Sequence, residues 1–357
     1  MSLLTVLADE NMPMVDDLFG SFCWIERKSG RDICRADLAE VDILLVRSIT
    51  QVDQELLQDT PVKFVGSATI GLDHVDVDYL KQQDIQFAYA AGCNAQAVAE
   101  YVLTAIAYWA NKRSVNLANA TVGIIGAGNV GSQLSQLLQQ LGIKYLLNDP
   151  PLAATSDSRD FVELQDIQHC DVVTCHVPLK IDGEYATQYL IDSDFLQAMQ
   201  GGSLLVNSSR GAVVNNQDAL KFKAWNQGVD YIFDVWEGEP DINQELLDAC
   251  LLATPHIAGY SLEGKVRGTY MLYRQLRDWL GKETGISLSS KLPRVTKWSP
   301  PKYLEDLHQS LIHHYDILAD DQALRAAKNG LPDTFDHLRK NYKTRLEFWK
   351  EHFDGAY

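Results

Sequence analysis

The glycine-rich segment at residues 121–131 constrains the fold of this chain more than any other. It reads Thr-Val-Gly-Ile-Ile-Gly-Ala-Gly-Asn-Val-Gly, an apolar run that predicts a short buried strand followed by a turn. Gly126, Gly128 and Gly131 follow the strand at G-x-G-x-x-G spacing, and residues 133–141 predict the next helix. A strand, a glycine turn and a helix in this order are typical of a dinucleotide-binding site.

Each glycine has a separate physical role in such a site. Gly126 permits a tight turn, Gly128 lets backbone approach a pyrophosphate, and Gly131 lets helix and strand pack closely. The helix N-terminus adds free N–H groups and a positive dipole end. Asp149 lies 18 residues beyond Gly131, where its carboxylate can bond ribose hydroxyls and repel a 2′-phosphate. The segment therefore predicts NAD binding, with a purely structural glycine turn as the alternative.

The bulk composition limits the partners of the chain. Its 357 residues, 46% hydrophobic and 22% charged, are typical of a globular protein of two or three domains. The net charge of -17 disfavours nucleic acid and requires local cations for any anionic substrate. The six scattered cysteines are typical of free thiols in a reducing cytoplasm. No apolar run is long enough to span a membrane and no secretory signal is apparent, so we expect no membrane partner.

The first ninety residues alternate apolar and polar stretches, which predicts a parallel α/β sheet. The expected strands lie at residues 3–7, 43–46, 62–65 and 85–88. Ligands of such sheets bind at the carboxyl ends of the strands. Ser67 is interpreted there as a helix cap. Arg47 is interpreted as an anion contact, because a cation that closes an apolar strand usually has an anion to meet.

A long helix is predicted at residues 95–112, and strand–helix alternation then continues to about residue 257. Each strand of this second region ends in a distinctive residue set. These sets include His176 with Val177, Arg210, Asp234 with Glu239, and His256. Because parallel strands present their carboxyl ends at one edge, we expect an arginine, a glutamate and a histidine beside the cofactor. A further helix is predicted at residues 265–279.

The last 75 or so residues contain no recognisable catalytic set. Amphipathic helices are predicted at residues 303–318, 321–328 and 332–353, and their aromatic side chains suit burial against another surface. Subunit association is the favoured interpretation, and a self-contained regulatory module is the alternative. His313 and His314 point apart on a helix and have no third ligand nearby, so we predict no metal site.

Several motifs together resemble the NAD-dependent D-2-hydroxyacid dehydrogenase family. They stand in the family's order at residues 126–131, 149, 207–211, 234–240 and 254–256. The resemblance implies an α/β fold with two Rossmann-like doubly wound parallel-sheet domains and a small C-terminal dimerisation domain. One domain is a flavodoxin-like substrate lobe and the other an NAD-binding lobe. The implied ranges are 1–95 with 258–285 for the substrate-binding domain, 96–257 for the NAD-binding domain and 286–357 for the dimerisation domain.

The resemblance also assigns roles to individual residues. It implies that NAD is held by Gly126, Gly128, Asn129, Val130, Gly131, Asp149, Val177, Ser208, Ser209, Asp234 and Gly259. It makes His256 the base that removes the hydroxyl proton, paired with Glu239, which favours the imidazolium that forms. Arg210 can hold a substrate carboxylate bidentately. The resemblance further implies substrate contacts from Ser48, Thr69 and Tyr260.

Further segments resemble one branch of the family, which oxidises a phosphorylated 2-hydroxy acid and acts as a cytoplasmic homodimer. They lie at residues 9–13, 46–50, 71–76, 92–94, 234–240 and 256–265. Arg47 is our assignment for the phosphate, with Lys265 and Arg267 as alternatives. Two functional alternatives stay open. One is a 3-phosphoglycerate or glyoxylate/hydroxypyruvate type of dehydrogenase, and the other is an NAD-sensing, corepressor-like interaction protein built on the same fold.

Overall fold

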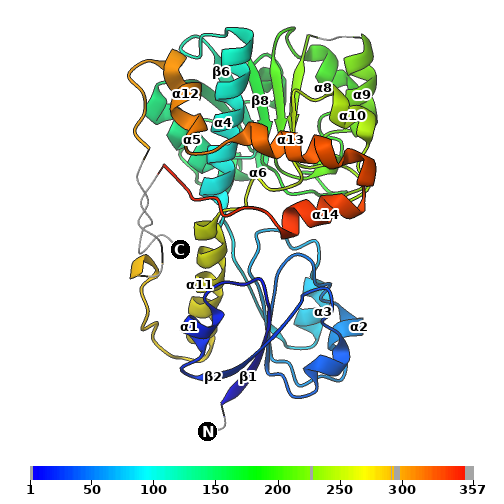
Figure 1. Ribbon diagram of the computed structural model, residues 1–357, viewed down its shortest axis with the longest axis vertical. Coiled ribbons are helices and arrows are strands. Elements are labelled where there is room, and N and C mark those ends of the chain that lie inside the picture. Colours follow the sequence, from blue (N-terminus) through cyan, green and yellow to red (C-terminus); the bar gives the residue numbers. More distant parts are fainter. Residues whose placement is uncertain (1–2, 226–227, 291, 293–297, 350–357) are drawn as a thin grey trace. The chain divides into compact units, whose positions relative to one another are not determined.

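The computed structural model describes residues 3–225, 228–290, 292 and 298–349. The chain divides into two compact units. The first contains Met1–Asn94 and Ser261–Val295, and the second contains Ala95–Tyr260 and Thr296–Trp349. Each unit has one parallel sheet with helices packed against it (Figure 1). The predicted α/β class with two doubly wound parallel sheets is confirmed.

The sheet of the first unit has the strand order β2-β1-β3-β4-β5. Its strands are β1 (Leu4–Asp9), β2 (Cys23–Lys28), β3 (Ile43–Val46), β4 (Phe64–Ser67) and β5 (Gln86–Tyr89). All neighbouring pairs are parallel. This is the flavodoxin-like order that the resemblance implied. The two central strands β3 and β4 are buried along their whole length, which is why they read as continuous apolar runs.

Strand β2, which lies at the edge of this sheet, was not among the predicted strands. Cys23 is its one buried residue, the others are half-buried or exposed, and they include the charged sequence Glu26-Arg27-Lys28. An edge strand has one neighbour and is often protected by charged side chains. Such a strand lacks the apolar run by which the other four could be found.

Helices pack on both faces of the first sheet. They are α1 (Val15–Phe19), α2 (Gln54–Leu57), α3 (Val77–Gln82) and α11 (Leu262–Trp279). The predicted helix at residues 265–279 is therefore present and begins three residues earlier. Ser261 caps it, since its hydroxyl accepts a hydrogen bond from the Gly264 N–H. Leu272 and Leu276 of α11 join the core formed with strands β1, β3 and β4.

The sheet of the second unit has the order β11-β10-β9-β8-β6-β7 and is also parallel. Its strands are β6 (Thr121–Ile125), β7 (Lys144–Asn148), β8 (Val172–Cys175), β9 (Leu204–Asn207), β10 (Asp230–Phe233) and β11 (Leu252–Ala253). The chain leaves β6 toward β7 on one side and then crosses to β8 on the other. The strand order thus reverses beside β6, and ligands of open α/β sheets bind at such a reversal.

Helix α4 (Ala95–Arg113) is buried on nearly every face, which explains its continuous apolar sequence. It packs against helix α5, against strand β9 of the sheet and against two helices of the C-terminal segment. The other helices between the strands are α5 (Asn129–Leu141), α6 (Pro150–Ala153), α7 (Leu164–Ile167), α8 (Ser193–Ala198), α9 (Asn216–Trp225) and α10 (Gln244–Ala249). Short 3-10 turns lie at Arg35–Leu38, Gly211–Val213, Leu288–Ser290, Leu304–Asp306 and Lys328–Gly330.

The C-terminal segment forms α12 (Leu307–Ile312), α13 (Ile317–Ala327) and α14 (Asp333–Lys340) on the second unit. In Figure 1 these helices are drawn in orange and red, and α13 contacts both α4 and β11. The predicted helix at 303–318 was wrong, because α12 ends at Ile312 and Asp316 caps a new helix.

The predicted helix at 332–353 was also too long, since α14 ends at Lys340. The backbone N–H groups of Phe348 and Trp349 instead donate to the side chain of Glu100, so they are not available to a helix. Residues 350–353 lie outside the described residues. The tail aromatics Trp298, Tyr315, Phe335, Phe348 and Trp349 are all buried.

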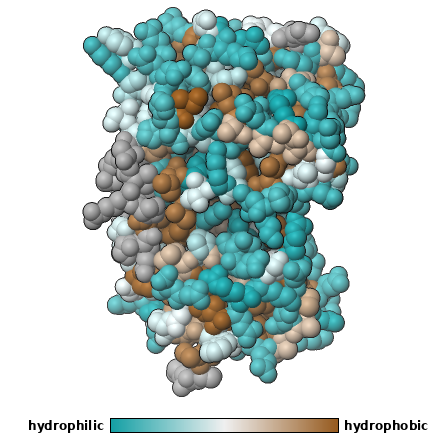
Figure 2. Space-filling view, in the orientation of Figure 1, coloured by the Kyte–Doolittle hydropathy of each residue, from teal (hydrophilic) through white to brown (hydrophobic). Residues whose placement is uncertain are grey.

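The surface is largely hydrophilic on the face shown in Figure 2, where hydrophobic residues are scattered in small groups. All six cysteines are free, and five of them are buried. None of the helices in the described residues has the length and apolarity that crossing a membrane requires.

Candidate active site

The glycine-rich turn follows β6 and closes against the turn after β8. Gly126 has a φ of +91°, and a Cβ atom there would lie 2.8 Å from the carbonyl carbon of His176. A Cβ atom on Gly131 would lie 2.1 Å from the Gly126 oxygen. Both positions therefore require glycine. Gly128 precedes α5 with no protein atom near its own missing Cβ and no capping side chain, so the first N–H groups of the helix can meet an anion.

The neighbouring cofactor candidates surround this turn. Asn129 and Val130 are the first two residues of α5. Val177 follows β8, and its Cγ1 would lie 2.9 Å from a Cβ atom on Gly126. The turn, the helix N-terminus and the loop after β8 thus meet where the strand order reverses, and they fit a dinucleotide.

Asp149 stands at the end of β7, as expected for a ribose contact. Its Oδ2 accepts a hydrogen bond from the Ala127 N–H at 2.8 Å, and its Oδ1 accepts one from the Leu152 N–H at 3.1 Å. The carboxylate therefore ties the glycine turn to the start of α6. It remains half-buried, so it can also face a ribose.

Arg159 lies beside the same turn, and the sequence analysis did not single it out. Its Nη1 donates to the Ala127 carbonyl and to the Ser132 hydroxyl, both at 2.9 Å. Its Nη2 lies 2.6 Å from Asp157, and Asp149 also interacts with it electrostatically. The negative charges of Asp157 and Asp149 thus outweigh the single positive charge of Arg159. This balance favours a neutral ribose over a 2′-phosphate.

His256 and Glu239 form the pair that the sequence analysis expected. Nδ1 of His256 lies 2.7 Å from Oε2 of Glu239, and Oε1 of Glu239 accepts the Trp236 N–H at 2.8 Å. Burial raises the pKa of Glu239, but the charge of His256 and these hydrogen bonds outweigh burial and leave the pKa lowered. Glu239 is therefore an anion that holds one ring nitrogen of His256 and leaves Nε2 to face a substrate.

The backbone around His256 is held by Asp234, which follows β10. The Asp234 carboxylate accepts hydrogen bonds from Thr254 Oγ1 at 2.6 Å, from the Ile257 N–H at 2.8 Å and from the Ala258 N–H at 2.9 Å. His256 has a φ of 57°, a conformation rare outside glycine. Burial raises the pKa of Asp234 in spite of these bonds. Asp234 stays a predicted cofactor contact, but its carboxylate is engaged in fixing the histidine turn.

Arg210 lies in the turn after β9, and its Nη1 donates to the Ser209 carbonyl at 2.8 Å. A Cβ atom on the next residue, Gly211, would lie 2.0 Å from the Trp236 carbonyl. The turn that carries Arg210 therefore packs directly on the loop that carries Glu239. The structure brings Arg210, Glu239 and His256 to the ends of neighbouring strands β9, β10 and β11.

Ser208 and Ser209, the other cofactor candidates after β9, are held by side chains at the strand ends. The Ser208 hydroxyl lies 3.4 Å from Nδ1 of His176, and the Ser209 hydroxyl donates to Asn207 Oδ1 at 2.9 Å. His176 also contacts Thr174 Oγ1 at 3.0 Å through Nε2. Although the residue is only half-buried, burial of its ring lowers the pKa of His176 to about 3. A neutral His176 adds no charge to the cofactor site.

In the first unit, Thr69 is part of a short hydrogen-bond chain. The Ser67 hydroxyl lies 2.8 Å from Thr69 Oγ1 and 3.0 Å from Nε2 of His74. Ser67 was expected to cap a helix, but it is fully buried and bonds these side chains instead. Ser48 is exposed, at the end of β3 next to β4. Ser48 and Thr69 thus end neighbouring strands, as a shared substrate contact requires.

The three phosphate candidates differ in their surroundings. Arg267 is buried and donates to the Cys93 carbonyl, which makes it a structural arginine. Lys265 lies on the first turn of α11 and is half-buried. Burial, followed by the charge of Arg47, lowers the pKa of Lys265. Arg47 and Lys265 therefore lie within electrostatic reach of one another.

Gly259 and Tyr260 follow the histidine turn, and the C-terminal segment packs on them. Nη2 of Arg345 donates to the Ala258 carbonyl at 2.5 Å. The Arg339 guanidinium lies 5.9 Å from the centre of the Tyr260 ring, which also packs edge-on against Tyr342 at 5.9 Å. These contacts join residues about eighty positions apart, so no local pattern in the sequence could have indicated them.

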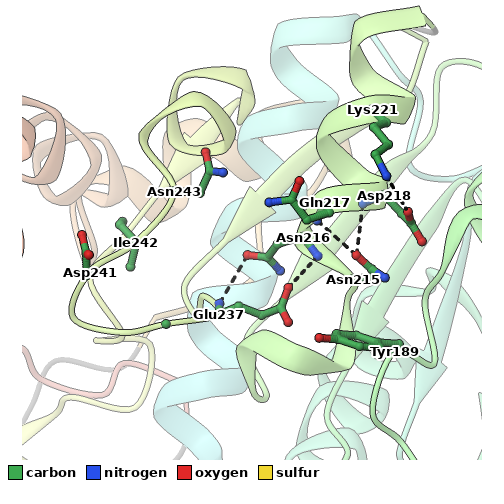
Figure 3. Close-up of a pocket in the computed structure, with 11 residues that line it drawn as sticks. Tyr189, Asn215, Asn216, Gln217, Asp218, Lys221, Glu237, Asp241, Ile242 and Asn243 are labelled. Carbon is green, nitrogen blue, oxygen red and sulfur yellow. Dashed lines mark hydrogen bonds and ion pairs between the residues drawn. The ribbon is translucent and has the colours of Figure 1, made fainter.

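A polar cavity of about 630 Å³ lies beside the loop that carries Glu239. Figure 3 shows Asn216, the first residue of α9, facing Glu237, while Asn215 accepts hydrogen bonds from the Gln217 and Asp218 N–H groups. Oε2 of Glu237 accepts the Asn216 N–H at 2.9 Å. The hydrogen bond anchors the loop to α9. Within the residues that the structure describes, no three His, Cys, Asp or Glu side chains are grouped to hold a metal ion.

Comparison with known proteins decides the family. An erythronate-4-phosphate dehydrogenase of Shewanella violacea is 43% identical over 97% of this chain and 93% of its own length. Erythronate-4-phosphate dehydrogenases of Shigella boydii and Escherichia coli are 44% identical over 97% of this chain and 92% of theirs. The chain belongs to the erythronate-4-phosphate dehydrogenases.

Two domain families also match parts of this member of the erythronate-4-phosphate dehydrogenases. Residues 94–258 match the D-isomer specific 2-hydroxyacid dehydrogenase, NAD binding domain, and residues 289–352 match a domain of unknown function, DUF3410. The predicted class of NAD-dependent 2-hydroxyacid dehydrogenase and the predicted cofactor, NAD, are confirmed.

Solved structures of distant relatives share the fold. A D-lactate dehydrogenase from Aquifex aeolicus, complexed with NAD and lactic acid, matches with a TM-score of 0.65 and 20% identity over 77% of this chain and 95% of its own. An NAD-bound 3-phosphoglycerate dehydrogenase from Entamoeba histolytica matches with a TM-score of 0.65 and 19% identity over 78% and 96%.

Proposed function

We propose that this chain oxidises 4-phospho-D-erythronate at C2 to (R)-3-hydroxy-2-oxo-4-phosphooxybutanoate, with NAD as the hydride acceptor. The full-length similarity to erythronate-4-phosphate dehydrogenases supports the choice of substrate. The observation that carries the chemistry is the 2.7 Å contact between His256 and Glu239, on the sheet that also bears the glycine turn. We propose that the reaction serves the biosynthesis of pyridoxine 5′-phosphate.

His256 is the general base of this reaction. Because Nδ1 faces Glu239, Nε2 is the nitrogen that takes the proton of the C2 hydroxyl. The histidine becomes a cation in this step, and the anionic Glu239 stabilises it. NAD, when bound, accepts the two electrons and the hydrogen of C2 as a hydride. The proton and the hydride together account for the two hydrogens lost when the alcohol becomes a ketone.

Arg210 binds the substrate carboxylate and polarises the C2 oxygen. A guanidinium holds a carboxylate through two parallel hydrogen bonds, which fixes the neighbouring C2 carbon as well as its charge. Each charge-assisted bond of this kind contributes roughly 1.5–3 kcal/mol. The packing of Gly211 on Trp236 supports the role, since it keeps the Arg210 turn next to the Glu239 loop.

The phosphate of the substrate is bound by Arg47 and Lys265 together. A net charge of -17 repels a phosphorylated acid unless paired cations meet it locally. The lowered pKa of Lys265, caused by burial and then by the charge of Arg47, supports the proposal that the two cations lie close enough to bind one phosphate. Ser48 and Thr69 donate hydrogen bonds to the middle of the substrate, and Tyr260 makes a further contact. The cofactor contacts are those assigned from the family resemblance.

The assembly and location are also proposals. We infer a cytoplasmic homodimer, because the resemblance implies one. The aromatic residues of the C-terminal segment do not by themselves favour a subunit interface, since five of them are already buried within the chain. Sedimentation equilibrium measures the assembly directly, and a monomer at micromolar concentration would contradict the proposal.

A substrate panel tests the function. NADH formation is followed by nicotinamide absorbance with 4-phospho-D-erythronate, D-erythronate, 3-phosphoglycerate and D-glycerate, with a 2-oxo acid acceptor present in case reduced cofactor leaves slowly. We expect the highest kcat/KM for 4-phospho-D-erythronate. A preference for 3-phosphoglycerate or D-glycerate would support the related dehydrogenases, and binding of NAD without turnover of any acid would support a cofactor-sensing protein.

A further inference from the structure

Arg339 lies in α14 of the C-terminal segment, next to Tyr260 of the proposed site. Its guanidinium stands 5.9 Å from the ring centre of Tyr260 and equally far from the ring of Phe335. Phe335 is fully buried, so it fixes the position of α14 on the second unit. Tyr260 is four residues beyond His256, and it is a proposed substrate contact. The arginine therefore lies against the segment that follows the catalytic base.

The Arg339 cation interacts electrostatically with Glu239 as well as with Tyr260. Burial lowers the pKa of Arg339, but Tyr260, Glu239 and Asp336 together outweigh burial and raise it. The reciprocal effect is present, because Arg339 is among the groups that lower the pKa of Glu239. Asp336 is the third of these groups, and its Oδ1 lies 3.5 Å from Nη1 of Arg339, with 34% of its side chain exposed against 16% for Arg339.

Arg325 of the C-terminal segment provides a comparison, because all three of its side-chain nitrogens donate hydrogen bonds. Arg325 donates through Nε to Asp321, through Nη1 to the Leu247 carbonyl and through Nη2 to the Cys250 carbonyl. Arg339 differs, because its buried Nε has no hydrogen-bond partner among the residues that the structure describes. A buried donor without a partner costs free energy, so packing alone does not account for an arginine at this position.

We propose that Arg339 is a positioning residue for the reaction: from the C-terminal segment it fixes the ring of Tyr260 and supports the negative charge of Glu239 beside His256. The inference rests on the proposed function and adds a role for the segment that matches a domain of unknown function. Arg345 assists by holding the Ala258 carbonyl, so the segment fixes the histidine turn at two points.

The groups around Glu239 determine how its charge depends on pH. His256 contacts Glu239 directly, and Arg339 acts on it from α14. Asp234, directly after β10, interacts with His256, and Tyr260 and Asp336 interact with Arg339. Loss of the Arg339 cation leaves Glu239 with one positive neighbour fewer, so Glu239 takes up a proton at higher pH.

The test compares Arg339→Gln, Arg339→Lys and Arg325→Gln in the full-length protein saturated with NAD. The readout is kcat and KM for 4-phospho-D-erythronate across the pH range, together with NAD affinity and thermal unfolding. For Arg339→Gln we expect kcat to fall about 10-fold and the acidic limb of the kcat profile to move upward by about half a pH unit or more. Arg339→Lys should restore the position of the limb, because it restores the charge.

Arg325→Gln is the matched control. Arg325 is a half-buried arginine of the same segment, and it bonds the Leu247 and Cys250 carbonyls rather than residues of the site. It should lower thermal stability and leave the pH profile in place. An unmoved acidic limb in Arg339→Gln, or the same movement in Arg325→Gln, would overturn the inference. If the unaltered protein oxidises none of the acids in the panel, the proposed function fails instead, so the two failures are distinguishable.

Discussion

Oε2 of Glu239 lies 2.7 Å from Nδ1 of His256, while Oε1 of the same carboxylate accepts the Trp236 N–H at 2.8 Å. Both carboxylate oxygens are therefore engaged, one by the histidine ring and one by the backbone of the glutamate's own loop. The arrangement fixes the orientation of the imidazole ring and provides the counter-charge for its protonated form. The features that position this pair are the Asp234 contacts to the histidine turn and the contacts made by the C-terminal segment.

Replacement of Glu239 by Gln should impair the base and alter acid stability in a defined direction. We expect kcat to fall by on the order of 10²-fold, because the imidazolium loses its counter-charge. The pKa of Glu239 is lowered in the folded chain, so its contribution to stability is present above the unfolded value of about 4.5 and is lost as pH falls through the folded value. Urea unfolding of both proteins from neutral to acidic pH measures the difference.

The difference in stability between the two proteins should change with pH in one direction. The stability of the unaltered protein relative to Glu239→Gln should decrease as the pH falls below about 4.5. A difference between the two proteins that does not change with pH would mean that Glu239 is not held as an anion in the folded chain.

Replacement of Asp149 by Ala should narrow the preference for NAD over NADP. The variant loses the carboxylate that repels a 2′-phosphate, and Arg159 is left with Asp157 as its main counter-charge. We expect the ratio of kcat/KM for the two cofactors to fall by about 10-fold or more. Because Asp149 also accepts the Ala127 N–H, Asp149→Asn is the companion variant that keeps an acceptor. An unchanged ratio in both variants would remove Asp149 from the cofactor site.

Replacement of Arg47 by Ala should affect a phosphorylated substrate more than its unphosphorylated analogue. We expect kcat/KM for 4-phospho-D-erythronate to fall by about 10²-fold and that for D-erythronate to change little. Lys265→Ala should have the same selectivity, and Lys63→Ala, which removes an exposed cation paired with Asp42, is the control. Equal losses with both substrates would exclude the phosphate role.

Replacement of Glu100 by Gln should stabilise the protein at alkaline pH. Burial and then the charge of Glu347 raise the pKa of Glu100 to about 8, although Gln96 and Trp349 donate hydrogen bonds to it. A carboxyl with a raised pKa favours folding most below its unfolded value of about 4.5, and this advantage is lost as pH rises toward 8. Glutamine keeps an oxygen for the Phe348 and Trp349 N–H groups and cannot ionise.

The gain from Glu100→Gln should grow by on the order of 1 kcal/mol for each pH unit through this range and then level off. Chemical unfolding at about pH 5 and about pH 9 measures it. Equal or lower stability of the variant at the higher pH would show that a neutral carboxyl at position 100 is not what holds the C-terminal segment.

The features that could be predicted from the sequence are those set by local spacing. The three glycines, Asp149 and the His256–Glu239 pair lie at strand ends, where the alternation of strands and helices already fixes their neighbours. Strand β2 could not be found in this way, because its charged edge sequence has no buried run. The same applies to Arg159, whose place beside Ala127 depends on a contact across 32 positions.

The C-terminal segment was the least predictable part of the chain. Its polar and apolar residues suggested that the last of three helices runs from 332 to 353, but the backbone of Phe348 and Trp349 is irregular and bonds to Glu100, nearly 250 positions earlier. Arg339 and Arg345 gain their roles only through such distant contacts. Periodicity describes one face of one element, and it contains no information about which distant carbonyl or carboxylate will meet that face.

The most direct test of the account is the rate of NADH formation from 4-phospho-D-erythronate by the unaltered protein and by His256→Ala, measured beside NAD affinity. We predict steady turnover by the unaltered protein, a loss of about 10²–10⁴-fold in kcat for His256→Ala, and nearly unchanged NAD affinity. Turnover close to normal in His256→Ala, or no turnover of this acid by the unaltered protein, would contradict the account.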